Sequence, residues 1–167
     1  YEISELNNAV SSDTEKLKNI KMKNGIHVKD NLINIISKIG EKITLGRSKT
    51  FENKNQKNYT YMHSVIQKNL SKLGVIVSLQ TNKSNEEIDV FGKQLAMHIA
   101  ASNPLSLLPE GLEDNIIEKE SKLIAEELQN TGKPKEIIDK IALGKLNKFK
   151  DENSLMEQFW VMDPKKK

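Results

Sequence analysis

The feature that most constrains how this chain folds is a change in the spacing of its apolar residues. In residues 1–40, and again after residue 86, apolar residues recur every three or four positions, which is the spacing of amphipathic helices. Between residues 41 and 80 apolar and polar residues alternate, which is the spacing of β-strands. Helices before and after a group of strands predict an α+β fold.

Three segments of the alternating region are predicted as strands: residues 43–47, 59–63 and 75–79. The third is apolar at nearly every position, as in a strand that is covered on both faces. The polar connection 52–58 has the character of a hairpin link, whereas residues 65–72 exceed what a tight turn needs and are predicted as a loop. Because short connections favour antiparallel pairing, we predict a three-stranded antiparallel sheet with flanking helices.

A helix follows the predicted strands and has recognisable signals at both ends. Ser84-Asn-Glu-Glu87 is a capping-box pattern. Asn103 precedes Pro104, which disfavours helical backbone at Asn103 and ends the helix there. We expect His98 off the buried stripe of this helix, as a flank residue or an interface residue. The buried stripe is predicted to consist of Ile88, Phe91, Leu95, Ile99 and Ser102.

Residues 114–150 are predicted as two helices joined by a short link. Apolar residues recur at helical spacing over residues 116–128 and 137–149. Gly132 suits the left-handed position after a helix, and Pro134 suits the start of the next one. Helices with so short a link pack as antiparallel neighbours. We therefore predict an antiparallel helical hairpin, a coiled coil, with exposed faces rich in Glu and Lys.

These elements divide the chain into four predicted parts. Residues 1–40 form a helical lead-in of the core domain, and residues 41–113 form a core subdomain of antiparallel sheet plus helix. Residues 114–150 form the helical hairpin, and residues 151–167 form a return segment with a truncated end. In that last part, residues 158–161 are an apolar patch that is predicted as a strand or as a segment packed on the body.

The lead-in contains two predicted helices. Asp13 is expected to cap a short helix with its carboxylate. An apolar stripe from Val28 to Ile39 predicts the second helix, and Gly40 suits its left-handed C-terminal position. His27 lies at the junction before this helix and is expected to be exposed.

The composition excludes several kinds of chemistry. The chain has no Cys, which removes thiol catalysis and zinc–thiolate sites. Its three histidines, His27, His63 and His98, do not have the local spacing of a pair of metal ligands. The sequence has no glycine-rich phosphate loop and no nucleophile elbow. We therefore expect no metal, no cofactor and no enzyme active site.

The charges point away from nucleic acid as a specific partner. Lys and Arg number 26 against 23 Asp and Glu, so the net charge is only +3. Arg47 is the sole arginine, although arginine is the residue best suited to reading bases and phosphates. No apolar run approaches the roughly 18 residues of a membrane span, and no signal peptide is recognisable. We expect a cytoplasmic protein that does not bind a membrane.

Sequence position alone makes His63 the best candidate for a functional residue. It is predicted to end a strand beside an irregular loop, a position where functional side chains concentrate. Tyr61, two residues earlier on the same strand face, is expected to shape the strand.

Eight short motifs along residues 38–164 together resemble a known family. In their order, they resemble the dimerisation-domain region of bacterial translation elongation factor Ts, the guanine nucleotide exchange factor of elongation factor Tu. The motifs are Lys38-Ile-Gly-Glu41, Tyr61-Met-His-Ser64, Leu73-Gly-Val-Ile-Val77, residues 91–104, Ile117-Glu-Lys-Glu120, Thr131-Gly-Lys-Pro134, Gly144-Lys-Leu-Asn-Lys-Phe149 and residues 158–164.

The resemblance implies a function that works by binding. A member of this family binds elongation factor Tu, in its GDP-bound and nucleotide-free states, and promotes GDP release. His63 matches the family histidine that contacts the nucleotide-binding domain of elongation factor Tu near its phosphate loop. Ile39 and Gly40 are expected to form the adjacent apolar contact. Tyr61 is placed with them in the partner-binding site, chiefly as a residue that shapes the strand.

The chain also departs from the family pattern. Ser64 stands where the family has Gly, residues 65–72 are longer than the usual link, and Trp160 intrudes into a family motif. The family's Thr-Asp-Phe-Val motif does not occur. We therefore expect a fragment that binds weakly and exchanges poorly. The alternative is a structural module that associates with itself as a homodimer, and a third hypothesis is an RNA or ribosome contact through the Lys-rich hairpin.

Overall fold

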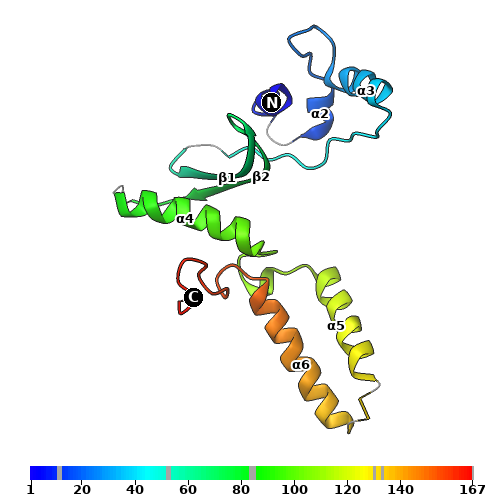
Figure 1. The fold of residues 1–167 in the computed structure, drawn as a ribbon, viewed down its shortest axis with the longest axis vertical. Coiled ribbons are helices and arrows are strands. Elements are labelled where there is room, and N and C mark those ends of the chain that lie inside the picture. The colour runs from blue at the N-terminus through cyan, green and yellow to red at the C-terminus, as the bar shows by residue number, and fades with distance from the viewer. Residues whose placement is uncertain (11–12, 52–53, 83–85, 130, 133, 167) are drawn as a thin grey trace. The chain divides into compact units, whose positions relative to one another are not determined.

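The computed structural model describes residues 1–10, 13–51, 54–82, 86–129, 131–132 and 134–166 (Figure 1). Two compact units are present, and each is described by itself. The N-terminal unit consists of Tyr1–Asn58, Ser64–Lys72 and Ser78–Asn82. The C-terminal unit consists of Tyr59–His63, Leu73–Val77 and Lys83–Lys167. The elements are α1 (Glu2–Asn7), α2 (Thr14–Lys18), α3 (Val28–Ile39), β1 (Lys57–Gln67), β2 (Leu70–Leu79), α4 (Glu86–Ser102), the 3-10 helix η1 (Pro109–Gly111), α5 (Asp114–Gln129) and α6 (Lys135–Glu152).

The sheet of the described residues has two strands, β1 and β2, so the prediction of three strands is wrong. Residues 43–47 carry no regular secondary structure. Their alternation involves only two apolar residues, Ile43 and Leu45, and the following Gly46 weakens a strand. The predicted loop at 65–72 is also wrong, because both strands continue through it to a turn at Lys68 and Asn69.

Only one face of the hairpin is well covered. Val77 on β2 is 9% exposed, whereas its neighbour Ile76 is 49% exposed. Successive strand residues point to opposite faces, so this difference separates a covered face from an open one. The prediction that residues 75–79 are covered on both faces is therefore wrong. The apolar residues at 75–79 are typical of a strand covered on both faces, but in the structure only one face of this strand is well covered.

Helix α4 is contacted on two sides, by Tyr59 of β1 and by the segment after α6, and the predicted apolar stripe did not indicate these contacts. Gly92, Ala96 and His98 are its buried residues, whereas Phe91 is 48% exposed. Phe91 was expected in the buried stripe, and that prediction is wrong because β1 approaches α4 closely at Gly92, where the Tyr59 ring takes the space of a side chain. The helix ends before Asn103, whose φ is 45°, as Pro104 predicted. The predicted capping residue Ser84 lies outside the described residues.

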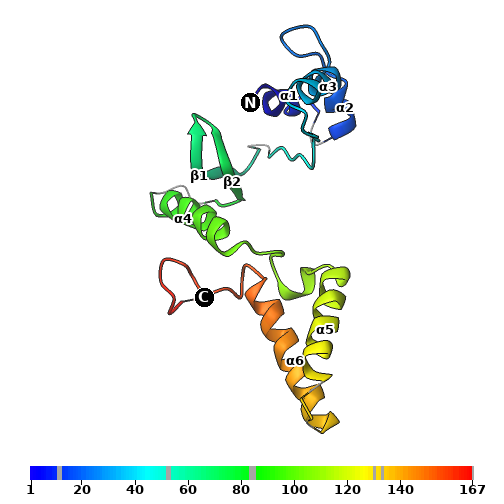
Figure 2. The ribbon, with the colours of Figure 1, turned by 45° about the vertical axis from the view of Figure 1, so that its right-hand side comes forward.

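Helices α5 and α6 form the predicted helical hairpin, and they lie side by side in both ribbon views (Figures 1 and 2). Ile124 and Leu128 of α5 are each 4% exposed. Glu127 of α5 pairs with Lys145 of α6. Gly132 has a φ of 66°, the left-handed backbone expected of the residue after a helix.

The segment after α6 returns to α4 and packs there, in agreement with one of the two predictions for residues 158–161. It first pairs with the chain that follows α4: the Leu105 N–H donates to Asn153 O at 2.9 Å, and the Leu155 N–H donates to Ser106 O at 3.0 Å. Trp160 then stacks on His98, with ring centroids 5.0 Å apart. The residues that follow α6 therefore form part of the C-terminal unit's packing.

The N-terminal unit is small and only sparsely buried. Leu17 of α2 and Val28 of α3 are 2% and 0% exposed. Asp13 caps α2 as predicted, since its carboxylate accepts from the Lys16 N–H at 2.9 Å. Gly40 ends α3 as predicted, with a φ of 74° and a hydrogen bond from its N–H to Ile36 O at 2.8 Å.

Candidate functional site

The candidate site contains a tyrosine and a histidine on the same face of β1. Tyr61 is half-buried and His63 is exposed. The Tyr61 hydroxyl and the His63 Nδ1 are 3.2 Å apart, and the two rings are tilted at 32° with centroids 6.1 Å apart. The structure therefore brings together two of the four residues predicted for the site, and each limits the freedom of the other.

His63 does not end its strand, as the sequence had suggested, but lies within β1 before a break in the regular backbone. Ser64 has a φ of 52°, in the left-handed region that favours glycine. A single residue of this kind inside a strand interrupts the alternation and re-aims the neighbouring side chain. The family has Gly where this chain has Ser64, so the conformation fits the position even though the residue type departs from the family pattern.

Apolar side chains on β2 add to the exposed surface of the same unit. Leu73 is 43% exposed and Ile76 is 49% exposed. Scattered apolar residues are normal on a protein surface, but these belong to the same hairpin as an exposed histidine. Because Leu73 and Ile76 are three residues apart on β2, they point to opposite faces, so only one of them can share a face of the hairpin with His63.

Ile39 and Gly40 belong to the N-terminal unit, whereas Tyr61 and His63 belong to the C-terminal unit. Ile39 is the last residue of α3 and is 53% exposed. Gly40 turns the chain away directly after it. The structure thus places an exposed apolar side chain at the end of α3, next to the turn at Gly40.

Sequence reasoning missed how His98 is used. Its side chain is 1% exposed, and its Nδ1 accepts from the Val161 N–H at 3.3 Å. Because a backbone N–H can only donate, the ring proton belongs on Nε2, which lies 3.2 Å from Gln158 Oε1. Of the two positions predicted for His98, the flank of the helix or an interface, the structure shows the interface, because the return segment covers its side chain. The nearby motif at residues 158–164, which carries polar and aromatic partners, was the available signal.

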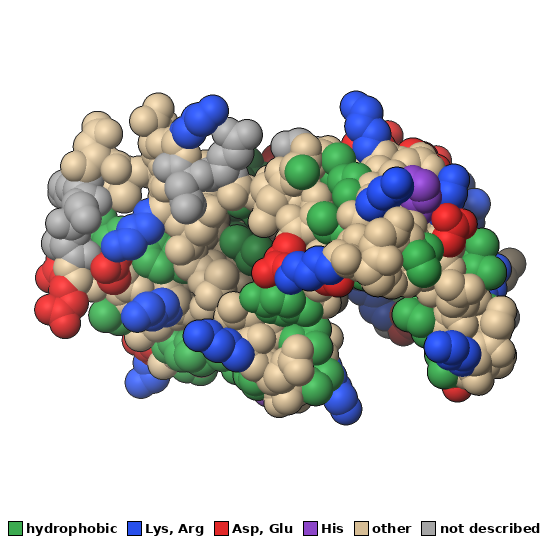
Figure 3. All heavy atoms as spheres, turned by 90° about the horizontal axis from the view of Figure 1, so that it is seen from above, with side chains coloured by type: hydrophobic (Ala, Val, Ile, Leu, Met, Phe, Trp, Pro, Cys, Tyr) green, Lys and Arg blue, Asp and Glu red, His purple; other side chains and the backbone are tan. Residues whose placement is uncertain are grey.

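The arrangement offers no obvious metal chemistry. Among the described residues, no group of three or more His, Asp or Glu side chains could hold a metal ion. Figure 3 shows Lys and Arg side chains with Asp and Glu side chains among them. Within the part of the chain that the structure describes, no helix is both long and apolar enough to cross a membrane.

The fold and this surface define the class: an α+β protein whose candidate site is an exposed patch rather than an enclosed cleft. Comparison with known proteins identifies the family. The family model described as Elongation factor TS matches residues 2–167. The chain belongs to the elongation factor Ts family.

Relatives from several bacteria support this assignment. The elongation factor Ts of Erythrobacter litoralis is 39% identical over 153 residues, which cover 92% of this chain and 50% of that protein. That of Bartonella quintana is 42% identical over 77% of this chain and 42% of its own length. That of Rickettsia bellii is 35% identical over 92% of this chain and 50% of its own length. The chain thus spans about half the length of the curated relatives that it matches.

Proposed function

We propose that this chain binds elongation factor Tu and promotes the release of its GDP during translation elongation in the cytoplasm. Membership of the elongation factor Ts family supports the partner and the type of reaction. The observation that carries the proposal to particular residues is the exposed His63, held by Tyr61 on β1. It is the position that the family resemblance assigns to the contact near the phosphate loop.

Exchange of this kind requires no bond-making chemistry. The chain needs only to bind the nucleotide-free state of elongation factor Tu more tightly than the GDP-bound state, because this difference in affinity drives GDP release. When the Tyr61 hydroxyl donates to Nδ1 of His63, the ring proton lies on Nε2. Nε2 is then a donor that is ready for a carbonyl or carboxylate oxygen of the partner.

The end of α3 provides the second contact of the proposal. Ile39 presents an exposed apolar side chain, and Gly40 adds backbone without a side chain in the way. Ile35, one turn earlier on the predicted stripe, is 45% exposed. We assign Ile39 and Gly40 an apolar contact that holds the partner while His63 acts on the nucleotide-binding region.

The direct test is the release of fluorescent GDP from elongation factor Tu in the presence of increasing amounts of this chain. We expect faster release, and we expect His63→Ala to reduce the acceleration at least fivefold. His27→Ala is the matched control, since His27 is a second partly exposed histidine at the start of α3. Equal activity of all three proteins would contradict the role of His63. No acceleration and no binding to the nucleotide-free partner would contradict the whole proposal.

Self-association remains the second candidate function, and exposed apolar side chains of the return segment favour it. Phe159 and Met156 are 63% and 59% exposed, and Val161 and Met162 are 42% and 39% exposed. Burying them between two copies is favourable by about 25 cal/mol for each Å² removed from water. Sedimentation velocity over a concentration series decides this alternative: a monomer at all concentrations contradicts it.

A further inference from the structure

We propose that Tyr59 and Asp89 are positioning residues for His63. Together they fix the start of β1 on α4, so that the Tyr61–His63 pair is presented in one orientation. This inference rests on the proposed function, because it assigns to these two residues an effect on GDP release. All of these residues belong to the C-terminal unit.

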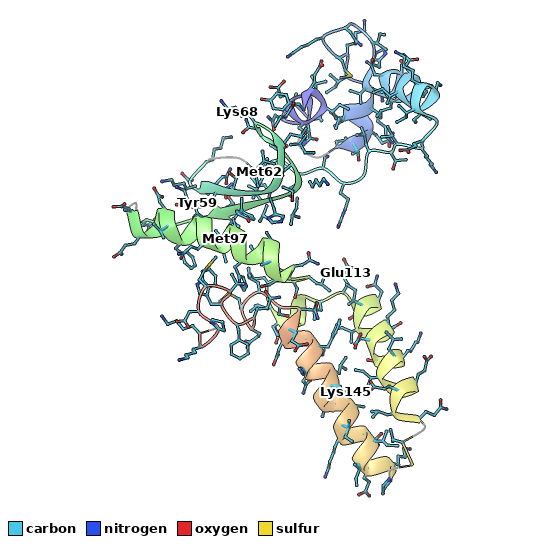
Figure 4. All side chains as sticks on the ribbon, viewed as in Figure 1. Tyr59, Met62, Lys68, Met97, Glu113 and Lys145 are labelled. Atoms are coloured by element: carbon cyan, nitrogen blue, oxygen red, sulfur yellow. The ribbon has the colours of Figure 1, made fainter. Side chains whose placement is uncertain are left out.

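The first observation is the fit of the Tyr59 ring against Gly92. A β-carbon added at Gly92 would lie 2.3 Å from Cδ2 and 2.5 Å from Cγ of Tyr59. The ring therefore occupies the space that any other residue at position 92 would need. Tyr59 is only 4% exposed, and Figure 4 shows it where β1 meets α4.

The second observation is the hydrogen bond at the far end of the same ring. The Tyr59 hydroxyl donates to Asp89 Oδ1 at 2.8 Å, in a partly buried place. Asp89 and Gly92 are three residues apart on α4, so they share one side of the helix. A hydrogen bond to a carboxylate is stronger and shorter than one between neutral groups. The packing against Gly92 therefore fixes the position of the Tyr59 ring, and the hydrogen bond to Asp89 fixes its orientation.

The third observation is the row that Tyr59 begins. Tyr59, Tyr61 and His63 lie at alternate positions of β1 and therefore on one face before the break at Ser64. Exposure increases along this row, from the buried Tyr59 through the half-buried Tyr61 to the exposed His63. The four residue steps from Tyr59 to His63 span about 13 Å of strand, so the residue that is held against α4 lies close to the histidine that it is proposed to position. A shift of β1 by one residue would turn the whole row to the other face.

Tyr61 transmits this placement to His63. Its hydroxyl lies 3.2 Å from Nδ1 of His63, so a strand that is held at Tyr59 also holds the histidine ring. Without the Tyr59 contact, β1 retains its pairing with β2 but loses its attachment to α4 at this point. His63 would then sample more orientations, and binding of the partner would have to restrict them.

The test uses changes that leave the packing in place. Tyr59→Phe keeps the ring and removes the hydroxyl, Asp89→Ala removes the acceptor, and Asp89→Asn keeps an acceptor oxygen and serves as the rescue. We expect the maximal rate of GDP release to fall about fivefold with Tyr59→Phe and Asp89→Ala, and to stay within about twofold with Asp89→Asn. Wild-type rates for Tyr59→Phe and Asp89→Ala, at a temperature where all variants are folded by circular dichroism, would overturn the proposal.

A second readout does not depend on elongation factor Tu. In NMR spectra of the free chain, the ring signals of His63 should shift or broaden in Tyr59→Phe, while those of His27 remain in place. Unmoved His63 signals would overturn the positioning role even if release is slowed. If instead His63→Ala has no effect on GDP release while the His63 ring signals of the otherwise unchanged chain respond to Tyr59→Phe, the role of His63 in GDP release fails, and with it the effect assigned to Tyr59 and Asp89. The mechanical link between Tyr59 and His63 then stands alone.

Discussion

Helices α3 and α4 show opposite relations between apolar pattern and burial. The stripe of α3 is regular, yet only Val28 at its start is buried, and Ile35 and Ile39 are 45% and 53% exposed. Helix α4 buries Gly92, Ala96 and His98, none of them a large apolar residue. The helix with the clearer apolar stripe is therefore the one that is covered less.

This difference shows that the spacing of apolar residues predicts where a helix forms better than it predicts which of its residues are buried. Close packing on α4 depends on the absence of a side chain at Gly92, which admits the ring of Tyr59. Ile35 and Ile39 of α3 remain exposed, and among the described residues of its own unit none covers them as Tyr59 covers Gly92. We interpret the first as a completed internal contact and the second as a surface that is available to a partner.

The strongest test of the α4 contact is Gly92→Val. The new side chain would have to occupy the volume of the Tyr59 ring, and overpacking of this kind costs about 3 kcal/mol of unfolding free energy. Urea unfolding followed by the fluorescence of Trp160, the single tryptophan, measures it in this unit.

Gly144→Ala is the matched control for that experiment. Gly144 also lies inside a helix, α6, but a β-carbon there meets nothing within 4 Å. We expect it to stabilise the chain by about 0.5–1 kcal/mol, because alanine favours helix over glycine. Equal effects of the two substitutions would contradict the proposed importance of the Tyr59–Gly92 contact.

The second side of α4 is tested by His98→Ala. This change leaves the Val161 N–H without its acceptor and Gln158 Oε1 without its donor, at a cost of about 2 kcal/mol. It also removes the ring on which Trp160 stacks, so the emission of Trp160 should move to longer wavelength. An unchanged spectrum and urea midpoint would show that His98 does not hold the return segment.

Ile39→Ser tests the exposed end of α3. Because Ile39 is 53% exposed, we expect the unfolding free energy to change by no more than about 0.5 kcal/mol. Affinity for nucleotide-free elongation factor Tu should fall roughly tenfold, which corresponds to about 1.4 kcal/mol. Ile33→Ser is the control, since Ile33 is 60% exposed on α3 but does not belong to the predicted stripe, which consists of Val28, Leu32, Ile35, Ile36 and Ile39. Titration calorimetry showing equal losses for both would contradict a specific contact at Ile39.

Local chemistry made much of the fold predictable. Asp13 at a helix start and Gly40 at a helix end act through backbone groups within a few residues, so the sequence alone was sufficient. The helical hairpin followed from two apolar stripes and a short link. The sheet was harder, because residues 43–47 alternate as a strand does and yet have no strand partner in the structure.

The site was predictable only in part, for a related reason. His63 and Tyr61 share a strand face by simple alternation, so their neighbourhood followed from the sequence. Contacts between segments far apart in the chain did not: Tyr59 meets Asp89, and His98 meets Val161. The spacing of apolar residues does not predict such long-range contacts, because they depend on how the side chains of different elements fit together after those elements have formed.

The smallest expected effect concerns the purely local contact at the start of α2, which involves neither α3 nor α4. The Lys16 N–H, which donates to the Asp13 carboxylate, lowers the pKa of Asp13 below its ordinary value of 3.8. A lowered pKa in the folded state means that the carboxylate stabilises the fold above about pH 3.8 and loses this effect as the pH falls through the folded-state pKa. The amide proton of Lys16, followed by NMR during an acid titration, should therefore shift with a midpoint below 3.8. Asp13→Asn keeps a capping oxygen and should abolish that titration, whereas a midpoint at or above the ordinary value would show that the cap does not favour the charged carboxylate.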